Sequence, residues 1–261
     1  MRHNINPVIA DLGPLQIRWY GFFYLLSFLL GFWLLRRNFR YRGIKLSKDD
    51  YENFLFNLCL GVIIGGRLGY VLFYNLGFYL HNPLKLLAVW EGGMSFHGGA
   101  IAVLFIGWLF CRKHGYNFFQ LADVTAPIGT IGLALGRLGN FINGELYGKV
   151  TDLPWGVIFP DGGEKPRHPS QLYEMLLEGI VLFIITQTVL RKSSRQGIVL
   201  WVWLLGYGSF RFLVEFVRIP DEQLGYFWNV LTMGQILSGI MILAGLAGIL
   251  FHHPRPHENK S

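Results

Sequence analysis

Cysteine and charge are both scarce in this sequence, and their scarcity argues against several classes of protein. There are 2 cysteines, Cys59 and Cys111, and charged residues make up only 15% of the 261 residues. Neither a Cys-x-x-Cys pair nor a Cys/His cluster is present, so neither a disulfide scaffold nor a metal site is expected. The net charge of +7 falls mostly in short loops between apolar runs, which argues against a nucleic-acid partner.

Three further signals are missing from the sequence. The first apolar run has no small-residue cleavage site and is followed at once by arginines, so no cleavable signal peptide is expected. No internal repeat is evident, which weakens the case for an inverted-repeat transporter. A Gly-x-Ser-x-Gly elbow is absent as well, so Ser95, two residues before His97, is not expected to act as a hydrolase nucleophile.

Long apolar runs are what the sequence has in abundance. Apolar residues make up 52% of the chain and aromatic residues 16%. Seven runs are long enough to cross a bilayer as helices, which predicts an all-α integral membrane protein with seven transmembrane helices. They extend approximately over residues 16–35, 51–74, 96–111, 118–140, 169–190, 197–217 and 229–251.

Basic residues mark one side of the predicted membrane protein. Clusters of Lys and Arg follow the first, third, fifth and seventh runs, whereas the alternate connections hold fewer although they are longer. By the positive-inside rule the N-terminus lies outside, on the periplasmic side, and the C-terminus is cytoplasmic. We expect one transmembrane domain over residues 1–251, with a small outer arm at about 149–167 as a flap over a cavity, and a polar cytoplasmic tail at 252–261.

The most polar part of any apolar run is the stretch Leu135–Lys149. It holds Arg137, Asn140, Asn143 and Glu145 together with four glycines. Charged groups inside a bilayer are costly unless they face a partner, water or a ligand, and clustered glycines let a ligand approach the backbone. A polar hinge at a helix end is the alternative interpretation. The combination of donors and acceptors favours a binding site, and one that prefers an anion.

Polar groups of six predicted helices lie at one depth. Counted at ~1.5 Å per residue from the cytoplasmic end of each run, they fall roughly 20 to 28 Å up, in the outer half of a ~30 Å hydrocarbon core. A shared layer indicates one cavity, open to the outer leaflet or the outer water. The groups are Tyr20, Arg67, His97, Arg137, Glu174, Glu178, Arg211 and Glu215.

The three arginines of this layer allow two interpretations. They can neutralise the three glutamates, because buried charges pair, or they can bind an anionic ligand, because guanidinium groups bind phosphate in bidentate fashion. We expect Arg67 to be structural, since it follows closely spaced glycines that are typical of a tight helix–helix seam. For Arg137 and Arg211 ligand binding is favoured.

Two histidines are open to more than one role. His97 stands between two Gly-Gly pairs at the outer mouth of the third run, where it is either a hydrogen-bonded anchor or a base that accepts a proton near neutral pH. His168 begins the re-entry into the fifth run, and its role stays open. Ser170 is expected to cap that helix, with Glu174 just inside its first turn.

These motifs resemble the bacterial prolipoprotein diacylglyceryl transferases along nearly the whole chain. The hallmark stretch is Gly136–Gly148, GRLGNFINGELYG. Further matching motifs are RWYG at 18–21, GGRLGY at 65–70, GGMSFHGG at 92–99, RHPSQLYE at 167–174, and GYG at 206–208 with Arg211, Glu215 and Arg218. The departures are mild: Tyr147 stands where tryptophan is frequent, Lys149 stands where arginine is frequent, and the outer arm is shorter than in some members.

The resemblance implies a transferase of the bacterial cytoplasmic (inner) membrane. It would move the diacylglyceryl group of phosphatidylglycerol to the lipobox cysteine thiol in the signal peptide of a prolipoprotein, forming a thioether and releasing glycerol phosphate. No cofactor and no metal is called for. The alternative is an anion or lipid transporter with an arginine-lined cavity at the outer leaflet. The family's functional positions fall on Tyr20, His97, Arg137, Asn140, Glu145, Gly148 and Arg211.

The expected roles follow from the chemistry of these side chains. Arg137 and Arg211 clamp the phosphodiester and stabilise charge that grows on its oxygens. Because a free cysteine thiol has a pKa near 8.5, a base is needed, and His97 is the hypothesis for it. Tyr20 and Glu145 orient their neighbours. The wider substrate-binding set is Asn140, Asn143, Gly148, Arg67, Glu215 and His168.

Overall fold

Helices make up most of the structure, a computed structural model in which residues 1–13, 16–88, 93–220, 226–227 and 230–252 are described. Most residues of the seven apolar runs are helical, so the protein is mostly helical, while the number of seven membrane spans stays a prediction. The sequence did not predict two short antiparallel hairpins, β1–β2 (Val8–Asp11 with Gln16–Arg18) and β3–β4 (Tyr226–Phe227 with Leu231–Thr232). Strands of two to four residues are too short to show a periodic pattern.

The helical elements have the following bounds. They are α1 (Trp19–Arg42), α2 (Lys48–Tyr74), α3 (Leu76–His81), the 3₁₀ turn η1 (Pro83–Leu87), α4 (Phe96–His114), α5 (Phe118–Asn143), the 3₁₀ turn η3 (Pro160–Gly162), α6 (Ser170–Glu174), the π-helical segment η4 (Met175–Val181), α7 (Leu182–Lys192), α8 (Ile198–Val214) and α9 (Met233–Phe251). The fifth apolar run is thus one continuous helix, built from α6, η4 and α7.

Among the described residues, five helices are long and apolar enough to cross a membrane. They are Trp19–Arg42, Lys48–Leu72, Phe118–Asn143, Ser170–Lys192 and Met233–Phe251, and Ile198–Val214 is a shorter apolar helix. Many large apolar side chains are exposed on them, including Leu29, Trp33 and Leu243. A helix that exposes such residues all along its length is typical of a lipid-facing surface. The chain is therefore a multi-pass membrane protein.

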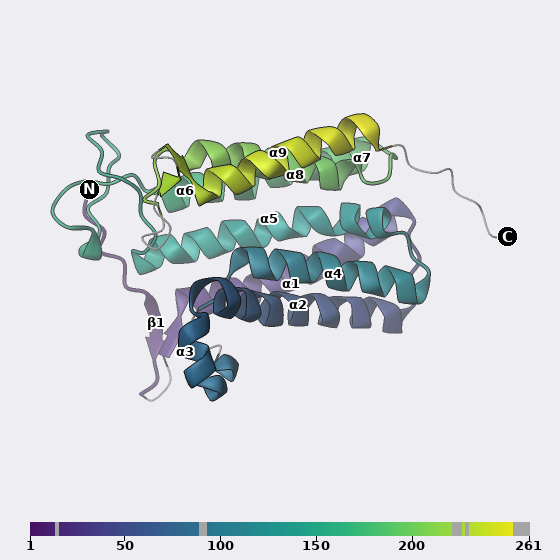
Figure 1. The fold of residues 1–261 in the computed structure, drawn as a ribbon, viewed down its shortest axis with the longest axis horizontal. Helices are drawn as coiled ribbons and strands as arrows, with labels where there is room; N and C mark the ends of the chain where they lie inside the picture. Colours follow the sequence, from purple (N-terminus) through teal and green to yellow (C-terminus); the bar gives the residue numbers. More distant parts are fainter. Residues whose placement is uncertain (14–15, 89–92, 221–225, 228–229, 253–261) are drawn as a thin grey trace. The chain divides into compact units, whose positions relative to one another are not determined.

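The chain divides into two compact units, residues 1–42 with 122–261, and residues 43–121. In the first unit α8 and α9 lie side by side (Figure 1), and small residues permit their close approach. A Cβ added at Gly208 of α8 would lie 2.8 Å from the carbonyl oxygen of Ser238 in α9. The continuous helix α6–η4–α7 packs on α8.

In the second unit, glycines form the seam between α2 and α4. A Cβ added at Gly65 would lie 2.6 Å from the carbonyl oxygen of Gly98, and one at Gly69 would lie 2.6 Å from the Gly98 Cα. No larger residue fits at these positions without moving the backbone of the neighbouring helix. The tight seam that the glycine spacing predicted around Arg67 is confirmed.

A buried carboxylate fixes the start of α8 against α5. Asp123 is 2% exposed, and its two oxygens accept hydrogen bonds from the backbone nitrogens of Gly197 (2.8 Å), Val199 (2.9 Å) and Leu200 (3.0 Å). These are orphan N–H groups of a helix start, where a negative charge also interacts favourably with the helix dipole. Asp123 thereby sets the position of α8, which carries Arg211 near its other end.

Candidate functional site

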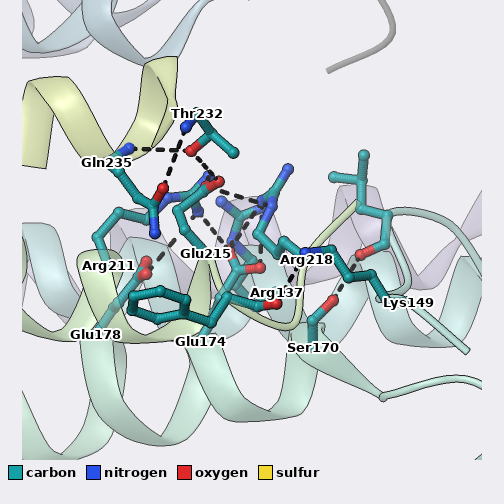
Figure 2. A network of polar contacts seen from close by, with 12 residues as sticks. Arg137, Lys149, Ser170, Glu174, Glu178, Arg211, Glu215, Arg218, Thr232 and Gln235 are labelled. Carbon is teal, nitrogen blue, oxygen red and sulfur yellow. Dashed lines mark hydrogen bonds and ion pairs between the residues drawn. The ribbon is translucent and has the colours of Figure 1, made fainter. Parts of the chain in front are cut away.

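The centre of a buried polar cluster in the first unit is Glu174, the last residue of α6. Its side chain is fully buried, and its Oε2 lies 2.7 Å from Arg137 Nε and 2.9 Å from Arg211 Nη1. Its Oε1 lies 3.2 Å from Arg218 Nη1. Figure 2 shows the three arginines converging on this one carboxylate from α5, from α8 and from the segment after α8.

A second carboxylate holds the other side of the cluster. Glu215 Oε1 lies 2.6 Å from Arg211 Nη2 and 3.6 Å from Arg218 Nε. Its Oε2 accepts a hydrogen bond from Thr232 Oγ1 at 2.8 Å, and Thr232 is the N-cap of α9 in a capping box with Gln235 (Figure 2). Glu174 and Glu215 therefore fix the guanidinium groups of Arg211 and Arg218 between them, and the start of α9 holds Glu215 in place.

Local packing explains why α5 and the fifth span come close enough for these ion pairs. A Cβ added at Gly179 would lie 2.5 Å from Ala134 Cβ and 2.8 Å from Ala134 Cα, so the two backbones are almost in contact there. Gly179 lies within the π-helical segment Met175–Val181, and such segments are frequent at functional sites. The close approach brings Glu174 within reach of Arg137.

The arginines are more accessible than the carboxylates that hold them. The side chains of Arg137 and Arg211 are 17% and 16% exposed, whereas Glu174 is 0% and Glu215 5% exposed. A guanidinium group has five N–H donors, and each of these two arginines uses only part of them on glutamate. The arrangement therefore presents two fixed cations that can bind an anion.

The network continues from Arg137 into the loop after α5. Arg137 Nη1 donates to Asn140 Oδ1 at 3.4 Å, and Asn140 Nδ2 donates to Glu145 Oε1 at 2.8 Å. Asn143 Nδ2 donates to the same oxygen at 3.2 Å. The four polar residues noted in the hallmark stretch are thus joined by hydrogen bonds into one network.

The loop that carries Glu145 has an unusual backbone. Gly144 and Leu146 have φ angles of +72° and +58°. The left-handed conformation is uncommon for a residue such as Leu, and where it occurs it is often at a functional site. The loop is held by hydrogen bonds from Ser170 Oγ to Leu146 O at 3.1 Å and from Gly148 N to His168 O at 2.8 Å. The prediction that Ser170 caps its helix is wrong, because Pro169 is the N-cap residue and the Ser170 hydroxyl donates to the loop instead.

Replacing Gly148 with alanine is expected to displace this loop. The added Cβ would lie 2.5 Å from Val217 O and 2.8 Å from His168 Cβ, so the backbone must shift next to Arg218. A shift of about 1 Å at a reacting centre can lower the rate ~100-fold. Turnover by Gly148→Ala should fall by at least ~10-fold, whereas Gly129→Ala in α5, where an added Cβ meets nothing within 4 Å, should leave it unchanged. Equal turnover by the two variants would contradict this role of Gly148.

Tyr20 lies against the hallmark stretch from α1. A Cβ added at Gly139 would lie 2.7 Å from Tyr20 Cδ2, so this glycine provides the space in which the Tyr20 ring sits. The ring also stacks at a tilt on Tyr24, with 5.1 Å between ring centroids. The Tyr20 ring therefore lies against Gly139 of α5, the residue that precedes Asn140.

Arg67 and His97 belong to the second unit, which is described by itself. The Arg67 guanidinium donates to the carbonyl oxygens of Leu86 at 3.1 Å, Ala88 at 3.0 Å and Gly93 at 3.3 Å, and to that of Lys85. Because the Arg67 guanidinium binds these loop carbonyl oxygens, the structure favours a structural role for Arg67 over ligand binding. His97 lies in the first turn of α4, and its side chain is outside the described part of the structure.

His168 is half-buried at the start of the fifth span, where the sequence left its role open. Its Nδ1 lies 3.3 Å from the hydroxyl of Tyr173, which accepts a hydrogen bond from Trp155 Nε1 at 2.7 Å. Partial burial lowers the pKa of the His168 imidazole, so the neutral form predominates at pH 7. Tyr173 of the fifth span thus contacts both His168 and Trp155 of the arm.

The site predicted from the sequence did not include Arg218 or Gln171. It also did not predict that Glu174 lies at the centre of the arginines. Arg218 lies three residues after Glu215 and seven after Arg211, a spacing that could have marked it as part of the same face. Gln171 is 0% exposed and donates to the carbonyl oxygen of Glu145. No group of three or more His, Cys, Asp or Glu in the described residues is arranged to hold a metal ion.

Comparison with known proteins places this geometry in context. The sequence model of a family described as "Prolipoprotein diacylglyceryl transferase" matches residues 7–251. A protein of Geobacter sulfurreducens named phosphatidylglycerol--prolipoprotein diacylglyceryl transferase is 56% identical over 243 residues, 93% of this chain and 94% of the relative. A protein of the same name from Vibrio vulnificus strain CMCP6 is 51% identical over 254 residues, 97% of this chain and 94% of the relative.

Proposed function

This chain belongs to the prolipoprotein diacylglyceryl transferase family, and from that premise we propose that it transfers the diacylglyceryl group of phosphatidylglycerol to the lipobox cysteine of prolipoproteins. The sulfur forms a thioether with the glycerol carbon next to the phosphate, and the carbon–oxygen bond to the phosphate breaks. Glycerol phosphate leaves with the electron pair of that bond. This is a transferase reaction in the biosynthesis of bacterial lipoproteins.

The observation that carries the proposal is the pair of partly exposed guanidinium groups fixed on Glu174. Arg137 Nε and Arg211 Nη1 contact the same carboxylate oxygen, at 2.7 Å and 2.9 Å, so both lie within reach of one phosphate group. A phosphodiester that becomes a leaving group gains negative charge on its oxygens. Cations that are held in place before the reaction stabilise that charge without having to reorganise.

The thiol must lose its proton before the sulfur attacks, since the thiolate is the nucleophile. The hypothesis from the sequence motif is that His97 takes this proton, while Tyr20 and Glu145 orient the groups around the reacting atoms. The hydrogen-bonded chain from Arg137 through Asn140 to Glu145 supports a role for Glu145 in orienting Arg137. No cofactor is needed for a displacement of this kind.

The proposed topology follows from the apolar runs and their flanking charges. Seven spans place the N-terminus outside and the C-terminus in the cytoplasm of a bacterium, with the protein in the inner membrane. The arm at 149–167 would then lie on the outer side as a flap near the site. Antiparallel bridges from Val150 and Val157 to Arg167 support a folded arm rather than a loose loop.

Release of glycerol phosphate by the purified protein tests the proposed function. The protein is mixed with phosphatidylglycerol and a synthetic lipobox peptide, and then with the same peptide carrying serine in place of cysteine. Release that requires both the cysteine and an intact Arg137, and is lost in Arg137→Ala, is the expected result. Release that ignores the cysteine would indicate a lipid hydrolase, and lipid binding without any release would indicate a transporter.

A further inference from the structure

Two buried amide oxygens beside Glu145 have no hydrogen-bond partner in the described structure. They are Asn143 Oδ1 and Gln171 Oε1. In both residues the amide nitrogen is already used, because Asn143 Nδ2 donates to Glu145 Oε1 and Gln171 Nε2 donates to the Glu145 carbonyl oxygen. Both partners are acceptors only, so neither amide can be turned over to exchange its nitrogen and oxygen.

Unpartnered buried acceptors are rare, because such a group has given up its hydrogen bonds to water. Gln171 is 0% exposed, so its oxygen is available only to a donor that enters the site. Replacing such a donor with an apolar group would leave the acceptor unpaired. A site built in this way discriminates strongly between ligands with and without the matching hydroxyl.

The position of Gln171 indicates which part of a bound lipid would contact its side chain. Gln171 and Glu174 are three residues apart on one helix, so their side chains lie on the same face about 5–6 Å apart at Cβ. Glu174 holds the arginines proposed to bind the phosphate, and Gln171 lies one turn toward the start of the helix. Asn143 is joined to one of these arginines, Arg137, by hydrogen bonds through Glu145 and Asn140.

We propose that Gln171 Oε1 and Asn143 Oδ1 accept hydrogen bonds from the hydroxyl groups of the glycerol headgroup, and so select phosphatidylglycerol among phospholipids. The inference rests on the proposed transferase function. The headgroup is joined directly to the phosphate, so its hydroxyls lie a few ångströms from the arginines. A headgroup without hydroxyl donors leaves both amide oxygens buried and unpaired.

The test compares phosphatidylglycerol with phosphatidylpropanol, which has the same charge and chain length but no headgroup hydroxyls. The wild-type protein should release propyl phosphate from phosphatidylpropanol with a kcat/KM at least ~10-fold lower than that for glycerol phosphate release from phosphatidylglycerol, the equivalent of one lost hydrogen bond to a buried acceptor. Gln171→Met and Asn143→Leu, which have no acceptor, should lower kcat/KM for phosphatidylglycerol and bring the ratio between the two lipids close to one.

The matched control is Gln187→Met on the same span, where Gln187 is also buried and donates to Asn38 Oδ1 at 3.3 Å. It should keep the wild-type ratio between the lipids. A merely structural role for Gln171 and Asn143 would lower kcat/KM for both lipids equally and leave the ratio intact, which would overturn the proposal. A change confined to KM for the peptide would overturn it in favour of a peptide N–H donor.

Binding of the two lipids without peptide covers the case in which a variant does not turn over. The wild-type protein should retain phosphatidylglycerol more tightly than phosphatidylpropanol, and the Gln171→Met variant should retain them equally. Equal binding of both lipids by the wild type, with normal release of glycerol phosphate, would sink this inference but leave the transferase intact. Absence of release from any lipid would instead contradict the proposed function.

Discussion

Replacing Glu174 with glutamine is expected to destabilise the protein and to lower glycerol phosphate release by at least ~100-fold. The carboxylate is fully buried and contacts Arg137, Arg211 and Arg218. Glutamine has the same shape, but it can accept with only one oxygen and turns its NH₂ toward an arginine. Breaking a buried ion pair by removing one partner costs about 3–5 kcal/mol. Thermal unfolding in detergent and release of glycerol phosphate are the measurements.

Glu178→Gln is the matched control for this substitution. Glu178 lies on the same span and is also 0% exposed, but its oxygens have no hydrogen-bond partner in the described structure, and its nearest ion pair, with Arg211, is 3.8 Å long. Loss of its charge removes no close contact. The unfolding temperature should therefore fall much less in Glu178→Gln than in Glu174→Gln. Similar losses in both variants would mean that Glu174 does not organise the arginines.

Replacing Arg137 with lysine is the second change with a large expected effect. Lysine keeps the positive charge, but its ammonium is a single point that cannot contact Glu174, Asn140 and a phosphate oxygen in the fixed geometry of a guanidinium group. Removing one preorganised donor from a site of developing negative charge typically lowers kcat about 10²- to 10³-fold. The expected result for Arg137→Lys is a loss of that size in kcat, with the unfolding temperature close to that of the wild type.

Arg195→Lys makes the same chemical change at the opposite end of the bundle. Arg195 Nη2 donates to Gly248 O at 3.5 Å and to His252 O at the C-terminal end of α9. Turnover by this control should stay within about twofold of the wild type, because the partners of Arg195 share no contact with the arginines at Glu174. If turnover by Arg137→Lys matches that of the control, positive charge alone is sufficient at position 137. The proposal that Arg137 binds the phosphate in bidentate fashion would then be wrong.

The helices, and the closeness of Arg137 to Arg211, could be predicted from the sequence for a simple physical reason. The rise of an α-helix is fixed, so counting residues from a charged end gives the depth of each side chain. Arg137 and Arg211 come from separate spans, and both contact Glu174 Oε2. The glycine seam of the second unit was likewise predictable, because a missing side chain is visible in the sequence itself.

The partners within the polar layer were not predictable to the same degree. Depth counting gives the height of a residue but not the rotation of its helix, so it could not tell that Glu174 rather than Glu178 receives three arginines. The hydroxyl of Ser170 was assigned to its own helix end by a local rule, but it found the carbonyl oxygen of Leu146 in another segment. Asp123, which caps α8 from α5, is equally a tertiary contact that no local pattern marks.

The mass of the lipobox peptide after reaction with phosphatidylglycerol of defined acyl chains tests the central claim most directly. Transfer of the diacylglyceryl group adds the mass of the diacylglycerol less one water, on the cysteine sulfur, with one glycerol phosphate released for each modified peptide. The wild-type protein should give this product, and Arg137→Ala should not. A gain equal to a single acyl chain, or an unmodified peptide alongside released glycerol phosphate, would contradict diacylglyceryl transfer to sulfur.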